Sequence, residues 1–537
     1  MKFVKYILIC LSTVVLFYSS WPPNALPGFI FFAFCPILFL VFNFNPSHTK
    51  FKNLYLFGLL LSTFFCVNFA LTYWVIYAHW LGGIFASVFN AFLMTAVFLV
   101  IYKIKAKLGK KQALISFPIL WLAFEYLHLN WEMSWPWMSL GHVFSDYPNW
   151  IQWYEYTGVL GGSAWVLGIN TIVYISFENF IKKKRSYSPI LFCFLGLTIP
   201  LICSNKLTKQ RTIGTNEKVN IVLVQPNFEP HKQKFTIPQA KQIQKVATML
   251  EAIWDKNPDL IILPETFITD WIWESRIETS AVILKMKSWL KNHPNTQIVT
   301  GASTGKILQK KDAIKSTART STNGTVYEVF NTALLITDKQ ETQIFHKSKL
   351  VPGAEMTPFS FILKPFFDKF PMKIGGSIGN FGTNDSLQNF TSLKGAFTPT
   401  ICYESIYGEY VSSFHSLGSN WICIITNDGW WGNTFGHQQH QSYARLRAIE
   451  NRKYVIRSAN TGISSVINPM GKVEQLLPYG KEGIIESEIT KHNRVTFYAK
   501  HGDYIGRLAS FLGIIYLLQV SDSVSDRLPS LPFRQYP

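Results

Sequence analysis

The chain has 537 residues, of which 48% are hydrophobic and only 15% charged, whereas a soluble domain usually carries about 25% charged residues. The formal net charge is +19, but no base-reading or phosphate-cradling motif accompanies the clustered lysines, which argues against a nucleic-acid partner. The seven cysteines contain no CxxC pair, and five of them lie in apolar segments, which argues against a disulfide framework and a zinc site.

Eight apolar segments approach the length of a membrane crossing, which takes roughly 17–25 residues in a helix. They are 6–21, 27–44, 54–76, 81–102, 113–127, 158–177, 189–203 and 504–520, of which the fifth and seventh are short. The first resembles a secretory signal, because Lys2 and Lys5 precede its apolar run. No small-residue cleavage site follows it, so we interpret this segment as a retained anchor.

The basic residues predict how these segments are oriented. With the N-terminus in the cytoplasm, the loops after the second, fourth and sixth segments are cytoplasmic too. They contain Lys50, Lys52, five lysines between positions 103 and 111, and the run KKKR at 182–185. The opposite loops, 22–26, 77–80 and 128–157, contain no lysine or arginine. Because basic loops stay on the cytoplasmic side, we expect residues 204–503 to lie outside the cytoplasmic membrane and both termini inside.

Loop 128–157 is rich in tryptophan and tyrosine. One interpretation is an aromatic belt at the membrane interface. Another is a vestibule for a lipid chain, and the two interpretations are compatible.

After a polar linker at 204–217, residues 218–500 alternate short apolar runs with polar stretches. The runs predicted as buried strands are 219–225, 260–264, 297–301, 332–336, 397–401 and 422–426, and the helical patterns are 238–254, 277–292 and 437–452. Strands that alternate with helices predict a layered α/β domain. The expected organisation is therefore membrane helices in 1–203, the linker, this domain at 218–500, and a last membrane helix with a cytoplasmic tail at 501–537.

Three chemically capable residues stand at the ends of apolar runs, where layered α/β folds place their sites. Glu265 follows a run ending in LP, Lys347 follows a run ending near Phe345, and Cys402 follows TPTI. A thiolate is a strong nucleophile, and we expect a helix N-terminus and a nearby ammonium to lower the pKa of the thiol. A carboxylate can take the thiol proton and an ammonium can stabilise an oxyanion. Together these residues suit acyl transfer through a thioester.

Each of these residues also has a structural interpretation. A single cysteine in such a domain is most often a packing residue, as we expect for Cys423 inside WICIIT, and a glutamate or lysine at a strand end is usually a paired surface group. His437 and His440 are spaced i, i+3 on a predicted helix, but no third ligand accompanies them. We therefore expect no metal and no other cofactor.

The motifs resemble those of the nitrilase (carbon–nitrogen hydrolase) superfamily, and more closely its membrane branch, the apolipoprotein N-acyltransferases. The similar segments are IILPET at 261–266, FHKSKLVPGAE at 345–355, ICYES at 401–405, TNDGWWG at 426–432, and the segment 447–471. The resemblance marks Glu265, Lys347 and Cys402 as catalytic. It marks Glu355, Tyr403 and Glu404 as supporting residues, and it implies an αββα sandwich attached to about eight membrane helices.

The resemblance also implies a function. A phospholipid, expected to be phosphatidylethanolamine, would donate its sn-1 acyl chain to Cys402, and the α-amine of a diacylglyceryl-cysteine on an apolipoprotein would accept it. We expect a monomer in the bacterial inner membrane with ping-pong kinetics. Phe235, Trp430 and Trp431 are the expected substrate contacts. Phe235 stands where the family often has a tryptophan, and LVPGAE and NDGWWG depart from the usual LVPFGE and NDAWFG, which leaves the lipid contacts open.

Two other functions remain open from the sequence. The same residues could hydrolyse a small amide in a membrane-tethered amidase, or the outer domain could only bind a lipoprotein. Because lipid chains are costly to expose to water, we expect the active site to open toward the membrane. Loop 353–395, which carries Phe359, Phe361, Phe366 and Phe367, is a candidate lid.

Overall fold

The computed structural model describes residues 2–24, 26–44, 51–184, 187–209, 214–215, 217–309, 315–360, 380–384 and 386–525. Its N-terminal part is a helical bundle, which α14 rejoins by packing against α5. The helices are α1 (Lys2–Ser20), α2 (Cys35–Asn43), α3 (Lys52–Thr72), α4 (Val75–Ala78), α5 (Trp80–Leu129), α6 (Tyr154–Ile181), α7 (Ser188–Lys209) and α14 (Tyr504–Ser525), with 3₁₀ turns η1 (Pro27–Phe32), η2 (Pro136–Met138), η3 (Leu140–Phe144) and η4 (Pro148–Trp150).

Every predicted membrane segment falls in this bundle. Among the described residues, five helices are long and apolar enough to cross a membrane, and two shorter apolar helices precede them. The fourth and fifth predicted crossings belong to α5, whose 50 residues are interrupted at Gly109 with φ 84°. At 1.5 Å per residue, α5 would be about 75 Å long if straight, which is enough for two crossings. The linker was predicted to begin too early, because α7 continues to Lys209.

The soluble domain consists of two stacked sheets. In the described part of the chain, an eight-stranded sheet has the order β14-β1-β2-β4-β6-β5, with β3 on β4 and β7 on β6, and a six-stranded sheet has the order β13-β12-β11-β10-β9-β8. The strands are β1 (Lys218–Gln225), β2 (Leu260–Ile262), β3 (Ile268–Trp273), β4 (Gln297–Ile307), β5 (Arg319–Thr320), β6 (Val326–Ile336), β7 (Gln343–His346), β8 (Phe390–Ser392), β9 (Gly395–Ile401), β10 (Trp421–Thr426), β11 (Val455–Ala459), β12 (Ser464–Ile467), β13 (Val473–Leu477) and β14 (Gly483–Thr490).

The apolar residues predicted as strands form the core between these sheets. Side chains such as Leu223 and Ile262 of one sheet and Ile401 and Ile425 of the other belong to one buried cluster. Helices α8 (Gln239–Leu250) and α9 (Ala281–Leu290) cover the outer face of the first sheet, and α11 (Gly408–Ser413) and α12 (Phe435–Asn451) cover that of the second. The expected αββα sandwich is confirmed.

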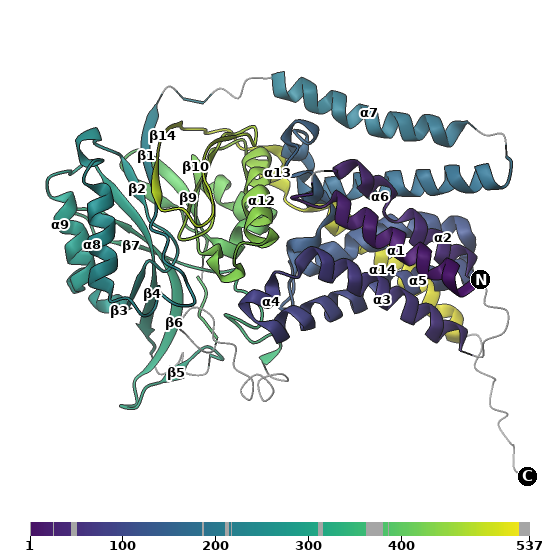
Figure 1. The fold of residues 1–537 in the computed structure, drawn as a ribbon, viewed down its shortest axis with the longest axis horizontal. Coiled ribbons are helices and arrows are strands. Elements are labelled where there is room, and N and C mark those ends of the chain that lie inside the picture. Colours follow the sequence, from purple (N-terminus) through teal and green to yellow (C-terminus); the bar gives the residue numbers. More distant parts are fainter. Residues whose placement is uncertain are drawn as a thin grey trace, which may run out of the picture.

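Helix α12 also joins the two parts of the molecule, because it lies between the second sheet and the bundle (Figure 1). Its Gln439 accepts hydrogen bonds from the indole N–H groups of Trp74 (3.2 Å) and Trp137 (2.7 Å) in the helical part. Just beyond α12, the buried Arg452 pairs with Glu155 of α6 at 2.5 Å. The sandwich is therefore docked on the bundle by buried polar contacts as well as by apolar packing.

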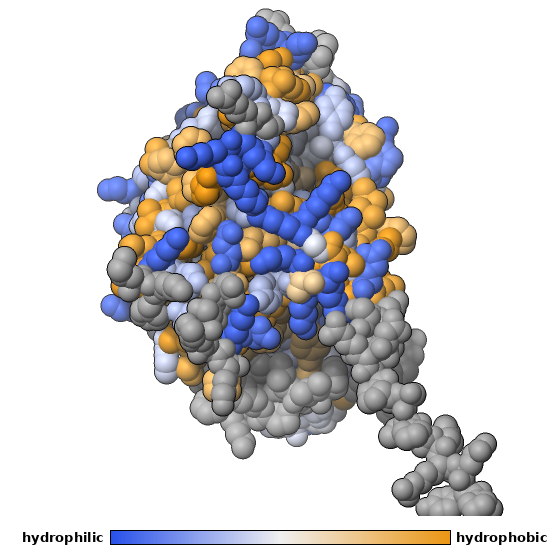
Figure 2. All heavy atoms as spheres, turned by 90° about the vertical axis from the view of Figure 1, so that its right-hand side faces the viewer, coloured by the Kyte–Doolittle hydropathy of each residue, from blue (hydrophilic) through white to orange (hydrophobic). Residues whose placement is uncertain are grey.

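The basic loops gather at the far end of the bundle. Lys110 pairs with Glu178, and Lys107 contacts the backbone of Val520 near the end of α14, so these loops lie at one end. Figure 2 looks at that end and shows many hydrophilic residues across it, framed by hydrophobic ones. The predicted separation of basic loops from the soluble domain is therefore present in the fold.

Candidate active site

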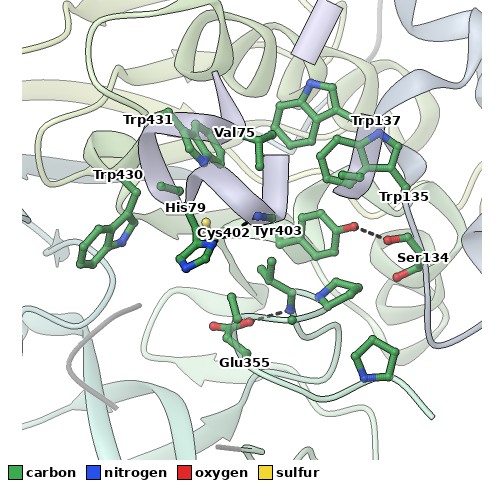
Figure 3. Close-up of a pocket in the computed structure, with 18 of the residues that line it drawn as sticks. Val75, His79, Ser134, Trp135, Trp137, Glu355, Cys402, Tyr403, Trp430 and Trp431 are labelled. Atoms are coloured by element: carbon green, nitrogen blue, oxygen red, sulfur yellow. Dashed lines mark hydrogen bonds between the residues drawn. The ribbon is translucent and has the colours of Figure 1, made fainter. Parts of the chain in front are cut away.

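The three predicted catalytic residues line one cavity of about 210 Å³. Glu265 follows β2, Lys347 follows β7 and Cys402 follows β9, so both sheets contribute strand ends to it. The opposite wall comes from the helical part of the chain, including Val75, His79 and the loop residues Ser134, Trp135 and Trp137 (Figure 3). The cavity thus lies where the sandwich meets the bundle.

A buried set of charges surrounds Lys347. Its Nζ lies 2.8 Å from Oε1 of Glu355 and 3.6 Å from Oε1 of Glu265. The amide of Asn331 donates to the same two oxygens, at 2.8 Å to Glu265 and 3.1 Å to Glu355. Burial alone would lower the pKa of Lys347, but Glu355 and Glu265 raise it above its ordinary value. Lys347 is therefore a fixed positive charge, and Glu355 is the nearer of its two carboxylate partners.

Cys402 occupies a strained turn, with φ 49° in the left-handed region, which costs free energy for a residue with a side chain. The hydroxyl of Ser405 donates to the Cys402 carbonyl at 2.7 Å, and Nε2 of His440 lies 3.2 Å from the same oxygen. These contacts hold the turn so that the thiol reaches the cavity.

The pKa of the Cys402 thiol does not follow the sequence-based expectation. Burial raises it well above its ordinary value, the negative charge of Glu265 raises it further, and Lys347 only partly offsets both. The chain after Cys402 forms the 3₁₀ turn η8 (Cys402–Ile406) and then the short helix α11, so the thiol does not stand at the N-terminus of an α-helix. With its pKa raised in this way, Cys402 needs a nearby base if it is to act as a nucleophile.

Glu404 and Tyr403 position the catalytic loops. Oε2 of Glu404 accepts the backbone N–H of Ile401 at 2.8 Å, and Oε1 accepts that of Ser348 at 2.7 Å. Glu404 therefore ties the cysteine strand to the residue after Lys347 without lining the cavity. Tyr403 lines the cavity and donates its hydroxyl to the Ser134 carbonyl of the helical part at 3.0 Å.

The predicted substrate contacts divide into two groups. Trp430 and Trp431 line the cavity, and Trp431 packs on Trp74 with ring centroids 4.6 Å apart. Phe235 is not a lining residue; it is 38% exposed and stacks on Trp430 at 6.1 Å. Phe235 thus contacts the cavity wall from outside.

Two predictions about loops have different outcomes. In loop 128–157, Trp135 and Trp137 line the cavity, which supports the vestibule interpretation, and the buried Trp137 does not face lipid. Of the candidate lid 353–395, residues 361–379 with Phe361, Phe366 and Phe367 lie outside the described residues. Phe359 is described, and its backbone N–H donates to Glu132 of loop 128–157.

Sequence reasoning missed several buried polar residues. Besides Asn331, Lys234 donates to the Glu265 carbonyl at 2.8 Å and to Oγ1 of Thr266 at 2.6 Å. Asp428, two residues after β10, could have been noticed by the same strand-end rule as the catalytic residues. By contrast, Asn331 lies inside strand β6, where the apolar pattern gave no signal.

Asp428 forms a buried cluster with Arg457 (2.5 Å) and His440 (2.9 Å). Burial would raise the pKa of Asp428, but Arg457 and His440 hold it well below its usual range. Cys402, Asp428 and His440 bring one ligand atom each within 4.8 Å of one another. Because Arg457 already balances the carboxylate, the charges of this cluster do not require a metal ion.

The chain is similar to known proteins over both its helical part and its sandwich domain. Residues 223–496 match the carbon-nitrogen hydrolase family and residues 14–172 match the apolipoprotein N-acyltransferase N-terminal domain. An apolipoprotein N-acyltransferase of Chlorobaculum tepidum is 26% identical, covering 95% of this chain and 94% of its own. One of Rickettsia typhi is 31% identical, covering 77% of each chain.

Among solved structures, Saccharomyces cerevisiae Nit3, a nitrilase-superfamily member, is 16% identical with a TM-score of 0.36, covering 60% of this chain and 97% of its own. The family matches span both the helical bundle and the sandwich, in the order in which the chain carries them. The chain therefore belongs to the carbon–nitrogen hydrolase family and, within it, to the apolipoprotein N-acyltransferases.

Proposed function

We propose that the protein transfers an acyl chain from the sn-1 position of a phospholipid, through a thioester on Cys402, to the N-terminal amine of a diacylglyceryl-cysteine apolipoprotein. The strongest support for this proposal is the composition of the cavity. Glu265, Lys347 and Cys402 line a single cavity whose opposite wall belongs to a membrane-type helical bundle. This arrangement brings thioester chemistry to a place that lipid chains can reach.

The first half-reaction acylates the enzyme. Glu265 takes the thiol proton while the Cys402 sulfur attacks the ester carbonyl, whose electron pair moves onto oxygen as an oxyanion. Lys347 stabilises this charge. The intermediate collapses by breaking the ester C–O bond, and the departing lysophospholipid oxygen takes the proton back from Glu265. A thioester and a lysophospholipid are the products.

The second half-reaction uses the same groups in the opposite sense. The free amine of the apolipoprotein attacks the thioester carbonyl and gives its proton to Glu265. The C–S bond breaks, and the sulfur leaves as a thiol with that proton. Because the lysophospholipid departs before the amine reacts, ping-pong kinetics follow.

The bundle reduces the cost of handling both substrates. Each carries acyl chains that cost about 0.8 kcal/mol per CH₂ group to expose to water, so a cavity next to the membrane avoids extracting them. The placement of the basic loops at the far end of the bundle (Figure 2) supports an outward-facing catalytic domain in the inner membrane, with cytoplasmic termini. A membrane-impermeant maleimide that labelled Lys256→Cys only from the cytoplasmic side would contradict this orientation.

The acceptor separates this function from that of a membrane-tethered amidase. With phosphatidylethanolamine as donor and a diacylglyceryl-cysteine peptide as acceptor, we expect mass spectrometry to detect the N-acyl peptide in preference to free fatty acid. Cys402→Ala should form neither product. Fatty acid as the sole product, with the peptide unchanged, would support a hydrolase instead.

A further inference from the structure

A buried asparagine beside the nucleophile has an unused hydrogen-bond donor. Asn427 lines the cavity and is only 2% exposed, and its Nδ2 has no hydrogen-bond partner among the described residues. Because an unpaired buried N–H costs free energy, such a group in a reaction cavity calls for a ligand that accepts its hydrogen bond.

The orientation of this amide is fixed by its neighbours. The backbone N–H of Phe228, which is a donor only, gives its hydrogen bond to Oδ1 of Asn460 at 3.0 Å. Nδ2 of Asn460 is therefore the donor side, and it donates to Oδ1 of Asn427 at 3.0 Å. Because this chain of contacts starts at a backbone amide that cannot flip, Nδ2 of Asn427 is the atom left for a substrate.

Strand pairing places Asn427 close to the nucleophile. β9 and β10 are parallel neighbours with Ile401 opposite Ile425, so Cys402 and Thr426 leave the sheet side by side. The Thr426 side chain contacts the Cys402 thiol, and Asn427 is the next residue. Lys347 reaches the same cavity from the other sheet.

Among the described lining residues, one other fully buried donor lacks a hydrogen-bond partner. The indole N–H of Trp135 is also unpartnered, but Trp135 belongs to loop 128–157 of the helical part and stands apart from Cys402 in Figure 3. Of these two buried donors, Asn427 is the one that directly follows the pair of strands β9 and β10, which positions Cys402. Its position therefore fits the reacting carbonyl better than a distant part of the lipid.

We infer that Asn427 is a further catalytic residue, whose Nδ2–H donates to the acyl carbonyl oxygen while that oxygen carries negative charge. This inference rests on the proposed function. As Cys402 attacks, the carbonyl electron pair moves onto oxygen, which Asn427 and Lys347 hold from the two sheets. Collapse re-forms the carbonyl and expels the lysophospholipid oxygen with the proton from Glu265. The amine-transfer step uses the same contact, because the same oxygen is charged again.

Two variants test this role, because each has a drawback that the other lacks. Asn427→Leu removes the donor without adding charge, and Asn427→Asp keeps the acceptor that Asn460 needs. We expect either change to slow acyl-adduct formation on Cys402 by about 100- to 1,000-fold, as for loss of one oxyanion donor, with little change in the KM for phosphatidylethanolamine. The rate is measured in detergent micelles by intact-protein mass spectrometry on the full-length protein.

The matched control is Thr400→Val. Thr400 lies on β9, is 1% exposed, and carries a hydroxyl with no partner among the described residues. It does not line the cavity, so this control should acylate at the wild-type rate. A folded Asn427 variant that acylates as fast as the wild type would overturn the inference. If the wild type itself formed no adduct, the proposed function would fail instead, so the two failures are distinct.

Discussion

At the scale of single residues, the proposed mechanism starts from a protonated thiol rather than a preformed thiolate. Burial and the charge of Glu265 both raise the pKa of Cys402, so we expect the sulfur to become nucleophilic only when Glu265 takes its proton. A thiol that stays protonated resists adventitious oxidation and alkylation, because the thiolate is the reactive form. The same carboxylate thus restrains the resting nucleophile and activates it during the reaction.

Replacing this carboxylate should separate the two effects. In Glu265→Gln, the loss of negative charge lowers the pKa of the thiol, so we expect faster alkylation of Cys402 by iodoacetamide at alkaline pH. Acyl transfer should fall by about 10²- to 10⁴-fold, because the general base is gone. Peptide mapping of the alkylated protein and a product assay give the two rates. Slower alkylation together with lost transfer would contradict this account of the thiol.

Lys234 provides a prediction about pH. Burial lowers its pKa to about 7, although Glu265 and Cys402 oppose the shift. Between about pH 7 and the higher pKa of the unfolded chain, the unfolded state binds more protons than the folded state, so stability contributed by this group rises with pH. In Lys234→Met, we expect the rise in unfolding temperature from pH 7 to 9.5 to be smaller than in the wild type.

The exposed Lys256 is a suitable comparison, because Lys256→Met removes a lysine far from the site. That variant should keep the wild-type slope of unfolding temperature against pH. An unchanged slope in Lys234→Met would show that the buried lysine keeps its proton at these pH values.

Some residues of the site could be predicted from the sequence and others could not. Glu265, Lys347 and Cys402 could be found because each follows an apolar strand and carries a family motif. Asn331 and Lys234 could not, because one lies within a buried strand and the other in a polar loop, where a single sequence does not reveal which side chain turns inward. The expected lowering of the Cys402 pKa was wrong. Burial of the thiol raises that pKa, and the sequence motif around Cys402 does not reveal how deeply the thiol is buried.

At the scale of elements, the side-chain amide of Gln439 holds helix α12 against the helical part of the chain. Gln439 accepts from two indoles, and its Nε2 donates to the carbonyls of Pro22 (2.9 Å) and Leu71 (3.3 Å). All four partners belong to the helical part. Gln439 therefore links α12 to Trp74 and Trp137, two tryptophans of the cavity wall.

Removing this amide should weaken the whole molecule. In Gln439→Leu, the indoles of Trp74 and Trp137 lose their acceptor, which costs about 1–3 kcal/mol per buried donor, so we expect a lower unfolding temperature in detergent. Gln441→Leu on the same helix is the control, since Nε2 of Gln441 has no partner among the described residues, and its effect should be smaller. Equal unfolding temperatures for the two variants would contradict the docking role.

Most elements were predictable from the pattern of apolar residues, but their ends were not. The six predicted strands and three predicted helices of the soluble domain all appear. The short strand β3 was not predicted, because a partly exposed strand lacks a continuous apolar run. α7 extends past its apolar residues to Lys209, so the end of the apolar run does not mark the end of the helix.

At the scale of the whole molecule, the sandwich and the bundle complete each other. The sandwich supplies Cys402, Glu265 and Lys347, whereas the helical part supplies aromatic side chains of the cavity wall, and we propose that lipid enters from the side of the bundle. Buried ion pairs such as Arg452–Glu155 fix the two parts together, and breaking such a pair leaves an uncompensated charge. The architecture of each part followed from the sequence, but the cavity between them did not, because contacts between distant segments leave no local pattern.

The most direct test of the account is the chemical state of Cys402 after exposure to lipid. Purified protein is incubated with phosphatidylethanolamine labelled in the sn-1 chain, and intact-protein and peptide mass spectrometry locate the label. We predict one labelled acyl group on Cys402, which leaves as an amide when a diacylglyceryl-cysteine peptide is added. Labelled N-acyl peptide formed by Cys402→Ser, or formed by the wild type with no label ever on Cys402, would contradict the account.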